Sequence, residues 1–512
     1  MALSNKILSS IDNKYNIAFL LVLIAGVFIR LKYLFVESIW HDEAAYMWQA
    51  GQLLNFNYIG TRIQEPLGLV VMWFYDLFMH AFTAGRVMSL TFSVAGIILI
   101  YLLGTEIKDK FIGIIAASLL TFHHLFWYLS EKALLDVPLT TMFILVAYFL
   151  IKSEKTPNYN LKFLPKIVQK NFWPILLGLS LIATVITKQA GILAVVYVLI
   201  YFLITRMHKI IKDNVALYAL GIPIGFILIG TVAYYILFRS FLLSKFFYYL
   251  FAMRSISQPF NFVGILPFVL TWYIIPLFVI GTIFALIYRR KSDLMLLLWF
   301  WVFFIFFSIN IGGPLPRYLL PILPAALLLA ALAIDEIRIY IKQILNFNVS
   351  KIIFIVIVLF FCFTFYQQGD EMNQSKADSY VGFREAGEWL AQNVPEDAVV
   401  YAGSPAAIRL FYGEEYLNEG YAEGFGSVDG KIYYGFPATK QEFEQQLLTR
   451  PSNVYLEVDI WEYKNQQWMY PLSQENFDYL ASLGFEPVYA VEREIPTQTG
   501  IQNVPVIYIL KK

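Results

Sequence analysis

The stretch Trp40-His41-Asp42-Glu43-Ala44-Ala45-Tyr46 directly follows the first long hydrophobic segment of the chain, residues 17–35. Its two adjacent carboxylates repel each other, and burial disfavours their charged forms, so they are costly to hold at a membrane surface. Such a pair is either the acidic first turn of an interfacial helix, favoured by the helix dipole, or a working site. The positions of the other polar motifs decide between these two interpretations.

The composition indicates a polytopic helical membrane protein. Of the 512 residues, 59% are hydrophobic and 15% are charged, whereas soluble domains are about 45–50% apolar and about 25% charged. A net charge of +1 gives no general reason to expect a nucleic-acid partner. The single cysteine, Cys362, excludes an intrachain disulfide. Lysines precede residues 17–35 but no small-residue cleavage site follows, so we expect a retained anchor.

Long apolar runs predict about eleven to thirteen transmembrane helices. The eleven clearest runs are residues 17–35, 84–103, 111–128, 133–151, 172–187, 190–204, 216–238, 262–288, 294–309, 315–333 and 352–366. The segment 67–79 is short and carries Asp76, so we expect it to lie at the interface instead of spanning.

Basic residues set the predicted topology, because Lys and Arg concentrate on the cytoplasmic side. With the N-terminus inside, every basic cluster falls inside; the clusters are 108–110, 152–170, 206–212, 289–291 and 338–351. Because each predicted span takes the chain to the other side of the membrane, the same topology places four polar regions and the tail outside. The regions are 41–65, 123–136, the turn at Lys188 and 312–317.

The tail, residues 367–512, has the composition of a soluble domain. Helical spacing is found at 383–393, 441–448 and 474–483, and short strand patterns at 398–402, 454–458, 487–491 and 504–510. We therefore predict two domains. Residues 1–366 form a membrane module with an external loop at 36–83, and residues 367–512 form an extracytoplasmic α/β domain.

Four polar constellations fall on the predicted outer side. They are Asp42-Glu43, Glu65 before a proline, His123-His124 through Glu131 to Asp136, and Lys188 with Arg317-Tyr318. A carboxylate can take the proton of an acceptor hydroxyl. Arg and Lys can bind a phosphate leaving group, Arg through its fork of donors and Lys as a point charge. The combination suits an enzyme that takes a phosphate-headed lipid as donor.

These motifs resemble the GT-C glycosyltransferases, and most of all the branch that contains protein O-mannosyltransferases and the lipid A aminoarabinose transferase (glycosyltransferase family 39). The matching strings occur in the family's order over roughly the first two-thirds of the chain. They are Arg30-Leu31, Trp40-His41-Asp42-Glu43-Ala44-x-Tyr46, Glu65-Pro66-Leu67, Gly85-Arg86, Leu135-Asp136-Val137-Pro138-Leu139, Thr187-Lys188-Gln189-Ala190-Gly191 and Arg317-Tyr318-Leu319-Leu320-Pro321-Ile322-Leu323-Pro324.

The resemblance implies an inverting transferase that moves mannose or a similar sugar from a polyprenyl-phosphate donor to a protein, lipid or lipid-linked glycan acceptor. Asp42 would be the catalytic acid or base with Glu43 beside it, and Asp136 would be the second acidic position. Lys188 and Arg317, with Tyr318, would bind the phosphate. The chain departs from relatives at Glu65 and Glu131, where they often carry basic residues. The expected location is the plasma membrane of a prokaryote, with the active site outside.

Other interpretations of the same residues stay open. His123, His124, Glu131 and Glu65 are candidate substrate or divalent-cation ligands, but paired histidines at an interface are commonly plain loop residues. Asp136 can cap a helix. Arg30 is expected to be an interface anchor. A membrane transporter or flippase for a lipid-linked sugar is the rival function, although no internal repeat is visible.

Overall fold

The computed structural model describes residues 14–51, 53, 66–155, 165–207, 212–238, 261–310, 314–344, 347–395, 398–404, 407–408, 432–437, 439–448, 453–461, 467–469, 472–497 and 500–512. The chain divides into two compact units. Unit 1 comprises Met1–Lys32, Gln64–Gly68 and Ser89–Met372, and unit 2 comprises Tyr33–Ile63, Leu69–Met88 and Asn373–Lys512.

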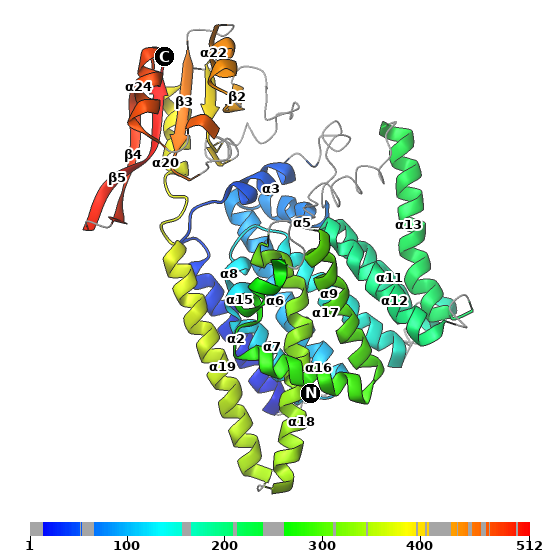
Figure 1. The fold of residues 1–512 in the computed structure, drawn as a ribbon. Coiled ribbons are helices and arrows are strands. Elements are labelled where there is room, and N and C mark those ends of the chain that lie inside the picture. Colours follow the sequence, from blue (N-terminus) through cyan, green and yellow to red (C-terminus); the bar gives the residue numbers. More distant parts are fainter. Residues whose placement is uncertain are drawn as a thin grey trace, which may run out of the picture. The chain divides into compact units, whose positions relative to one another are not determined.

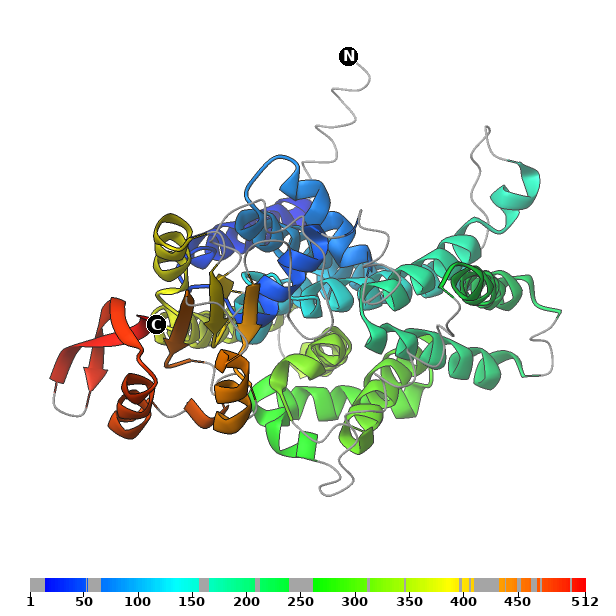
Figure 2. The same ribbon diagram turned by 90° about the horizontal axis from the view of Figure 1, so that it is seen from above.

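Unit 1 is a bundle of apolar helices (Figures 1 and 2). Its helical elements are α2 (Lys14–Tyr33), α6 (Ala81–Ile107), α7 (Lys110–Phe122), α8 (His124–Ser130), α9 (Asp136–Lys155), α10 (Lys166–Lys170), α11 (Phe172–Thr187), η1 (Gln189–Gly191), α12 (Ile192–Arg206), α13 (Asn214–Phe238), α15 (Asn261–Leu270), α16 (Ile274–Tyr288), α17 (Lys291–Asn310), η2 (Pro316–Ile322), α18 (Leu323–Ile344) and α19 (Phe347–Lys376). The N-terminal ends of α2 and α19 belong to unit 1, and α6 starts in unit 2.

The described residues contain eight helices that are long and apolar enough to cross a membrane, or ten if each of two bent helix pairs forms one span. The sixteen-residue helix α11 corresponds to a further predicted span but is shorter than the others. The predicted interfacial segment forms α5 (Pro66–Asp76), whose eleven residues are too few to span a bilayer. The prediction of a polytopic helical protein is confirmed.

Two predicted spans are interrupted. The run 111–128 breaks at His123 into α7 and α8, which meet at a 62° bend, and the run 262–288 breaks into α15 and α16 at 106°. His123 has ψ of 120°, outside the helical region, and Thr271 has a left-handed φ of 62°. A β-branched residue rarely adopts this conformation, so the surrounding packing must hold Thr271 there.

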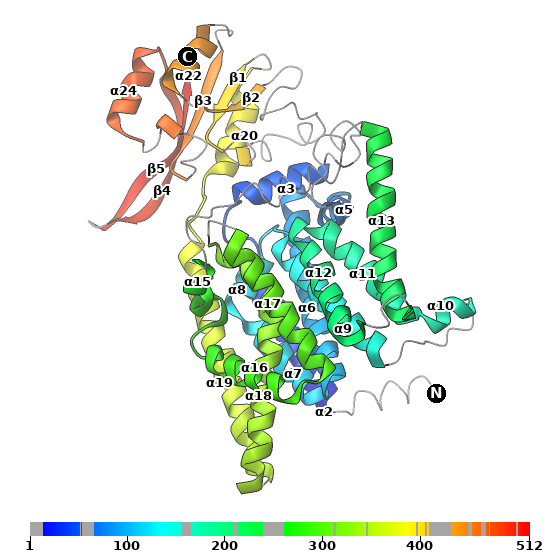
Figure 3. The same cartoon turned by 45° about the vertical axis from the view of Figure 1, so that its right-hand side comes forward.

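Helix α18 is the centre of unit 1, because 94% of its most apolar window, counted with η2, is buried. It packs against α7 and α16, and a Cβ at Gly281 of α16 would overlap the carbonyl oxygen of Leu329 in α18. On another side of the bundle, α11 packs against both α9 and α13 (Figure 3).

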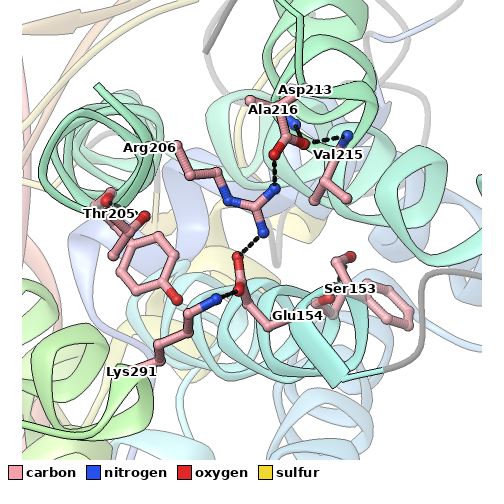
Figure 4. Close-up of polar contacts among 10 residues, drawn as sticks. Ser153, Glu154, Thr205, Arg206, Asp213, Val215, Ala216 and Lys291 are labelled. Atoms are coloured by element: carbon pink, nitrogen blue, oxygen red, sulfur yellow. Dashed lines mark hydrogen bonds and ion pairs between the residues drawn. The ribbon is translucent and has the colours of Figure 1, made fainter. Parts of the chain in front are cut away.

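A network of ion pairs ties the helix ends at one end of unit 1 (Figure 4). Glu154, at the end of α9, pairs with Arg206 of α12 and with Lys291 of α17, the latter at 2.5 Å. Arg206 also pairs with Asp213 before α13. Further pairs join Lys152 to Glu106, Lys108 to Asp335 and Glu336, and Arg290 to Glu336. Each of the five predicted basic clusters therefore contributes a residue to the ion pairs at these helix ends; the residues are Lys108, Lys152, Arg206, Lys291 and Arg338.

Unit 2 contains α3 (His41–Gly51) and a mixed sheet in the tail (Figure 1). The tail elements are α20 (Phe383–Asn393), β1 (Val399–Ala402), β2 (Ile432–Gly435), α22 (Lys440–Leu448), β3 (Val454–Asp459), η4 (Gln467–Met469), α24 (Gln474–Ser482), β4 (Glu486–Thr497) and β5 (Gly500–Lys511). The sheet order is β2-β1-β3-β5-β4, in which β2, β1 and β3 are parallel and β5 runs antiparallel to both its neighbours.

The core of this sheet is apolar and aromatic. Tyr401 of β1, Leu456 of β3 and Phe443 of α22 are fully buried and belong to one cluster with Phe436 and Leu480. The three helices and four of the strands match segments predicted from the sequence. Strand β2 was not predicted, and β4 and β5 are each twelve residues long, which is longer than expected.

Candidate active site

The acidic motif lies in the first turn of α3. The carbonyl of Trp40 accepts a hydrogen bond from the backbone N–H of Ala44 at 3.0 Å, so Trp40 is the N-cap of the helix. In return, the backbone N–H of Trp40 donates to Oε2 of Glu43 at 3.0 Å. A glutamate that reaches back to the N-cap from the third helical position is one half of a capping box. The sequence therefore fixes the start of α3 at the motif itself.

Glu43 is fully buried in an ion pair with Arg86, which is also fully buried. Arg86 donates from Nε to Oε1 of Glu43 and from Nη2 to Oε2, both at 3.2 Å. It also donates to three backbone carbonyls between α2 and α3, those of Leu34 at 2.7 Å, Glu37 at 2.9 Å and Ser38 at 2.9 Å. This arginine therefore ties the connection before α3 to the beginning of α6.

The two carboxylates of the motif have different surroundings. Asp42 is half-buried, whereas Glu43 is enclosed by Arg86 and Trp40. The neighbouring His41 is half-buried; burial lowers its pKa, and the charge of Asp42 opposes that shift in part. Of the two acids, Asp42 is the more exposed.

Unit 1 brings together the second acidic position and the predicted phosphate ligands. Asp136 begins α9 and is buried, and its Oδ1 accepts a hydrogen bond from Nζ of Lys188 at 2.9 Å. The ammonium of Lys188 lies 6.0 Å from the ring centre of Tyr318, and the guanidinium of Arg317 lies 5.7 Å from the same ring. Two cations thus lie close to the ring of Tyr318, and one of them, Lys188, is paired with Asp136.

Local backbone geometry presents Lys188. Helix α11 ends at Thr187, and Lys188 adopts an extended conformation with φ of −160° before η1 begins. A Cβ at Gly191 would overlap the backbone of Thr184, so this turn requires glycine. The lysine therefore sits at a tight break between α11 and α12, where its side chain is only 18% exposed.

The histidine pair lies at the break between α7 and α8. His123 and His124 are buried with their rings stacked at 4.6 Å, and His123 contacts Phe365 at 4.8 Å. Within the described ranges, no group of three or more His, Cys, Asp or Glu side chains could hold a metal ion. Glu131 is buried and accepts a hydrogen bond from the indole of Trp127 at 2.5 Å. Glu65 lies outside the described residues.

The structure changes the interpretation of two arginines. Arg30 is not an interface anchor, because it is fully buried and donates to Ser93 Oγ at 2.6 Å and to the carbonyl of Gly26 at 2.9 Å. Arg86 was noted only as part of a motif string. The signal that could have singled it out is its charge at the start of a long apolar helix, where an ionisable residue usually has a partner or a function.

Comparison with solved structures identifies the fold as that of the GT-C membrane glycosyltransferases, as the order of the motifs predicts. The chain is similar to ArnT from Cupriavidus metallidurans in the apo state, with 15% identity and a TM-score of 0.60 over 96% of this chain and 97% of ArnT. The same protein bound to undecaprenyl phosphate gives 14% identity and a TM-score of 0.59 over the same shares.

A third similar structure is the archaeal oligosaccharyltransferase AglB from Archaeoglobus fulgidus in complex with an inhibitory peptide and a dolichol-phosphate. It shows 14% identity and a TM-score of 0.58 over 95% of this chain and 74% of AglB. At the level of sequence, residues 74–255 match the dolichyl-phosphate-mannose-protein mannosyltransferase family. No curated protein sequence matches the chain.

Proposed function

We propose that the protein is an inverting glycosyltransferase that moves a sugar from a polyprenyl-phosphate donor to a hydroxyl of a protein, lipid or lipid-linked glycan acceptor. The observation that carries the proposal is the GT-C fold, found together with the Asp136–Lys188 pair beside Arg317 and Tyr318. The match of residues 74–255 to the mannosyltransferase family supports mannose or a similar sugar as the transferred group.

In the proposed reaction, Asp42 takes the proton of the acceptor hydroxyl while the acceptor oxygen attacks the anomeric carbon. The bond from that carbon to the phosphate oxygen breaks, and the polyprenyl phosphate leaves with the bonding electron pair. Lys188 and Arg317 bind the phosphate and stabilise the charge that it gains on leaving. Attack from the face opposite the leaving group inverts the anomeric configuration.

The polyprenyl-phosphate donor is supported by the ligands of the similar structures, which are undecaprenyl phosphate in ArnT and dolichol-phosphate in AglB. We propose that the reaction takes place outside the cytoplasm. Basic clusters face the cytoplasm, and here they lie at the ion-paired helix ends. Asp136 begins α9, whereas Glu154 of the ion-paired network lies at the other end of that helix. Residues 1–366 would be the catalytic module and 367–512 an extracytoplasmic domain, in the plasma membrane of a prokaryote.

Transport of a lipid-linked sugar is a second candidate, and one observation favours it. The α7–α8 and α15–α16 pairs are interrupted helices, which transporters use to build binding sites within the membrane.

One experiment separates the two functions. Purified protein in detergent, where no gradient exists, is incubated with polyprenyl-phosphate-linked mannose, aminoarabinose or galactose and with native membrane extract as acceptor. Mass spectrometry then follows the release of polyprenyl phosphate. Release by the wild type supports transfer and identifies the donor sugar. The same protein is also reconstituted into lipid vesicles, and movement of the donor across their membranes without any release of polyprenyl phosphate would instead support transport.

A further inference from the structure

The connection between α19 and α20 has an unusual backbone. Tyr380 adopts a left-handed conformation with φ of 60°, and Gly382 follows with φ of 104°. Glycine accepts this region without strain, whereas a bulky aromatic residue does so only when its surroundings hold it there. The contacts of Tyr380 must therefore stabilise its left-handed backbone conformation.

The ring of Tyr380 contacts two tryptophan rings of unit 2. The ring centres of Tyr380 and Trp40 are 6.1 Å apart, and those of Tyr380 and Trp461 are 5.8 Å apart. Both distances lie in the range of favourable aromatic pairs. Trp40 is the N-cap of α3, directly before His41 and Asp42, whereas Trp461 follows the end of β3.

Each tryptophan also makes hydrogen bonds. The backbone N–H of Trp461 donates to Oδ1 of Asp459 at 2.6 Å, and its indole N–H donates to the carbonyl of Val381 at 3.1 Å. Trp40 is held by Glu43 and, through its indole, by Glu37. The contacts therefore run without a gap from the end of β3, through Tyr380, to the first turn of α3.

We propose that Tyr380 is a positioning residue for the acidic motif. It holds Trp40, Trp40 fixes the first turn of α3, and that turn orients Asp42. The C-terminal sheet thereby supports the reaction without supplying a reacting group. The effect on turnover rests on the proposed transferase function, whereas the effect on the order of α3 does not.

The test compares three substitutions of Tyr380 in the full-length protein. Tyr380→Phe keeps the ring, Tyr380→Ala removes it, and Tyr380→Gly removes it while relieving the left-handed backbone. The matched control is Tyr489→Ala, because Tyr489 stacks on Trp389 at 5.1 Å within the same tail and, among the described residues, has no ring contact with Trp40 or Tyr380. Hydrogen exchange of the peptide covering residues 33–51 and the kcat and KM of sugar transfer are measured for each variant.

The expected result is exchange of residues 33–51 about fivefold faster in Tyr380→Ala and Tyr380→Gly, with Tyr380→Phe and Tyr489→Ala unchanged. In the same two variants kcat falls about tenfold, while KM for the donor stays within about twofold. Unchanged exchange in Tyr380→Ala, or an equal change in Tyr489→Ala, would overturn the proposal. A wild type without turnover would defeat the proposed function, and the exchange result would still decide the role of Tyr380.

Discussion

Replacing Arg86 with methionine should loosen the start of α3 more than any change on the surface of unit 2. The substitution keeps an unbranched apolar stem but removes the guanidinium, so it leaves the buried carboxylate of Glu43 without its cation and three carbonyls without their donor. Breaking a buried ion pair by removing one partner costs about 3–5 kcal/mol. The orphaned carbonyls act in the same direction.

The matched control is Arg384→Met. Arg384 pairs with Glu388 at 2.8 Å, but the two side chains are 69% and 50% exposed. A pair of this kind contributes about 0.3–0.5 kcal/mol. A further variant, Glu43→Gln, leaves the Arg86 cation without its carboxylate but keeps its three carbonyl acceptors and an acceptor for the N–H of Trp40, so it should cost less than Arg86→Met.

Hydrogen exchange of the peptide covering residues 33–51 in the full-length protein reads this difference directly. A loss of 3 kcal/mol corresponds to exchange about 100-fold faster or more. We expect this change in Arg86→Met, a smaller one in Glu43→Gln and almost none in Arg384→Met. The double variant Glu43→Leu/Arg86→Met should regain part of the protection, because it no longer buries an unpaired charge. Equal exchange in Arg86→Met and Arg384→Met would refute this account of the motif.

Three further predictions concern other parts of the molecule. Lys188→Ala should raise the KM for the donor at least about tenfold, because a phosphate ligand is lost, whereas Lys170→Ala, at an exposed position, should leave kinetic parameters unchanged. Glu154→Gln should lower the melting temperature of the purified protein by several degrees, since Arg206 and Lys291 lose a shared and largely buried partner; Glu388→Gln should not. For Glu457, burial first and the charge of Asp459 second raise the pKa well above its ordinary value of 4.5. The folded state then holds a proton that the unfolded state releases, so stability falls as pH rises from 4.5 toward the raised pKa. The melting temperature of Glu457→Gln should therefore exceed that of the wild type, and the difference should grow as pH rises above 4.5. A difference that does not change with pH would contradict the raised pKa of Glu457.

Hydropathy and basic clusters predicted most of the membrane bundle, because the length and composition of a spanning helix follow from the bilayer itself. The helix breaks were not predicted. Thr271 lies in an apolar run without a glycine beside it, so its left-handed backbone is imposed by packing that sequence periodicity does not record. In the tail, β4 continues through Arg493 and Pro496 although its alternation of apolar residues has ended. The strand continues because its backbone pairs with β5 over this stretch.

The candidate site was predictable where topology alone brings residues together. Asp136 and Lys188 both lie at predicted outer helix ends, and the structure pairs them. The partner of Glu43 was not predictable, because Arg86 reaches it through the folded turn before α3. The contact of Trp40 with Tyr380 joins segments that are far apart in the chain, and no local pattern in the sequence reports it.

The role of Asp42 tests the central claim most directly. Wild type and Asp42→Asn are purified, shown to have equal melting temperatures, and incubated with the polyprenyl-phosphate sugars and membrane extract while polyprenyl phosphate release is measured. The account predicts release by the wild type with at least one donor and a loss of at least about 100-fold in Asp42→Asn, within the range that a positioned general base contributes. Wild-type turnover in Asp42→Asn would contradict it.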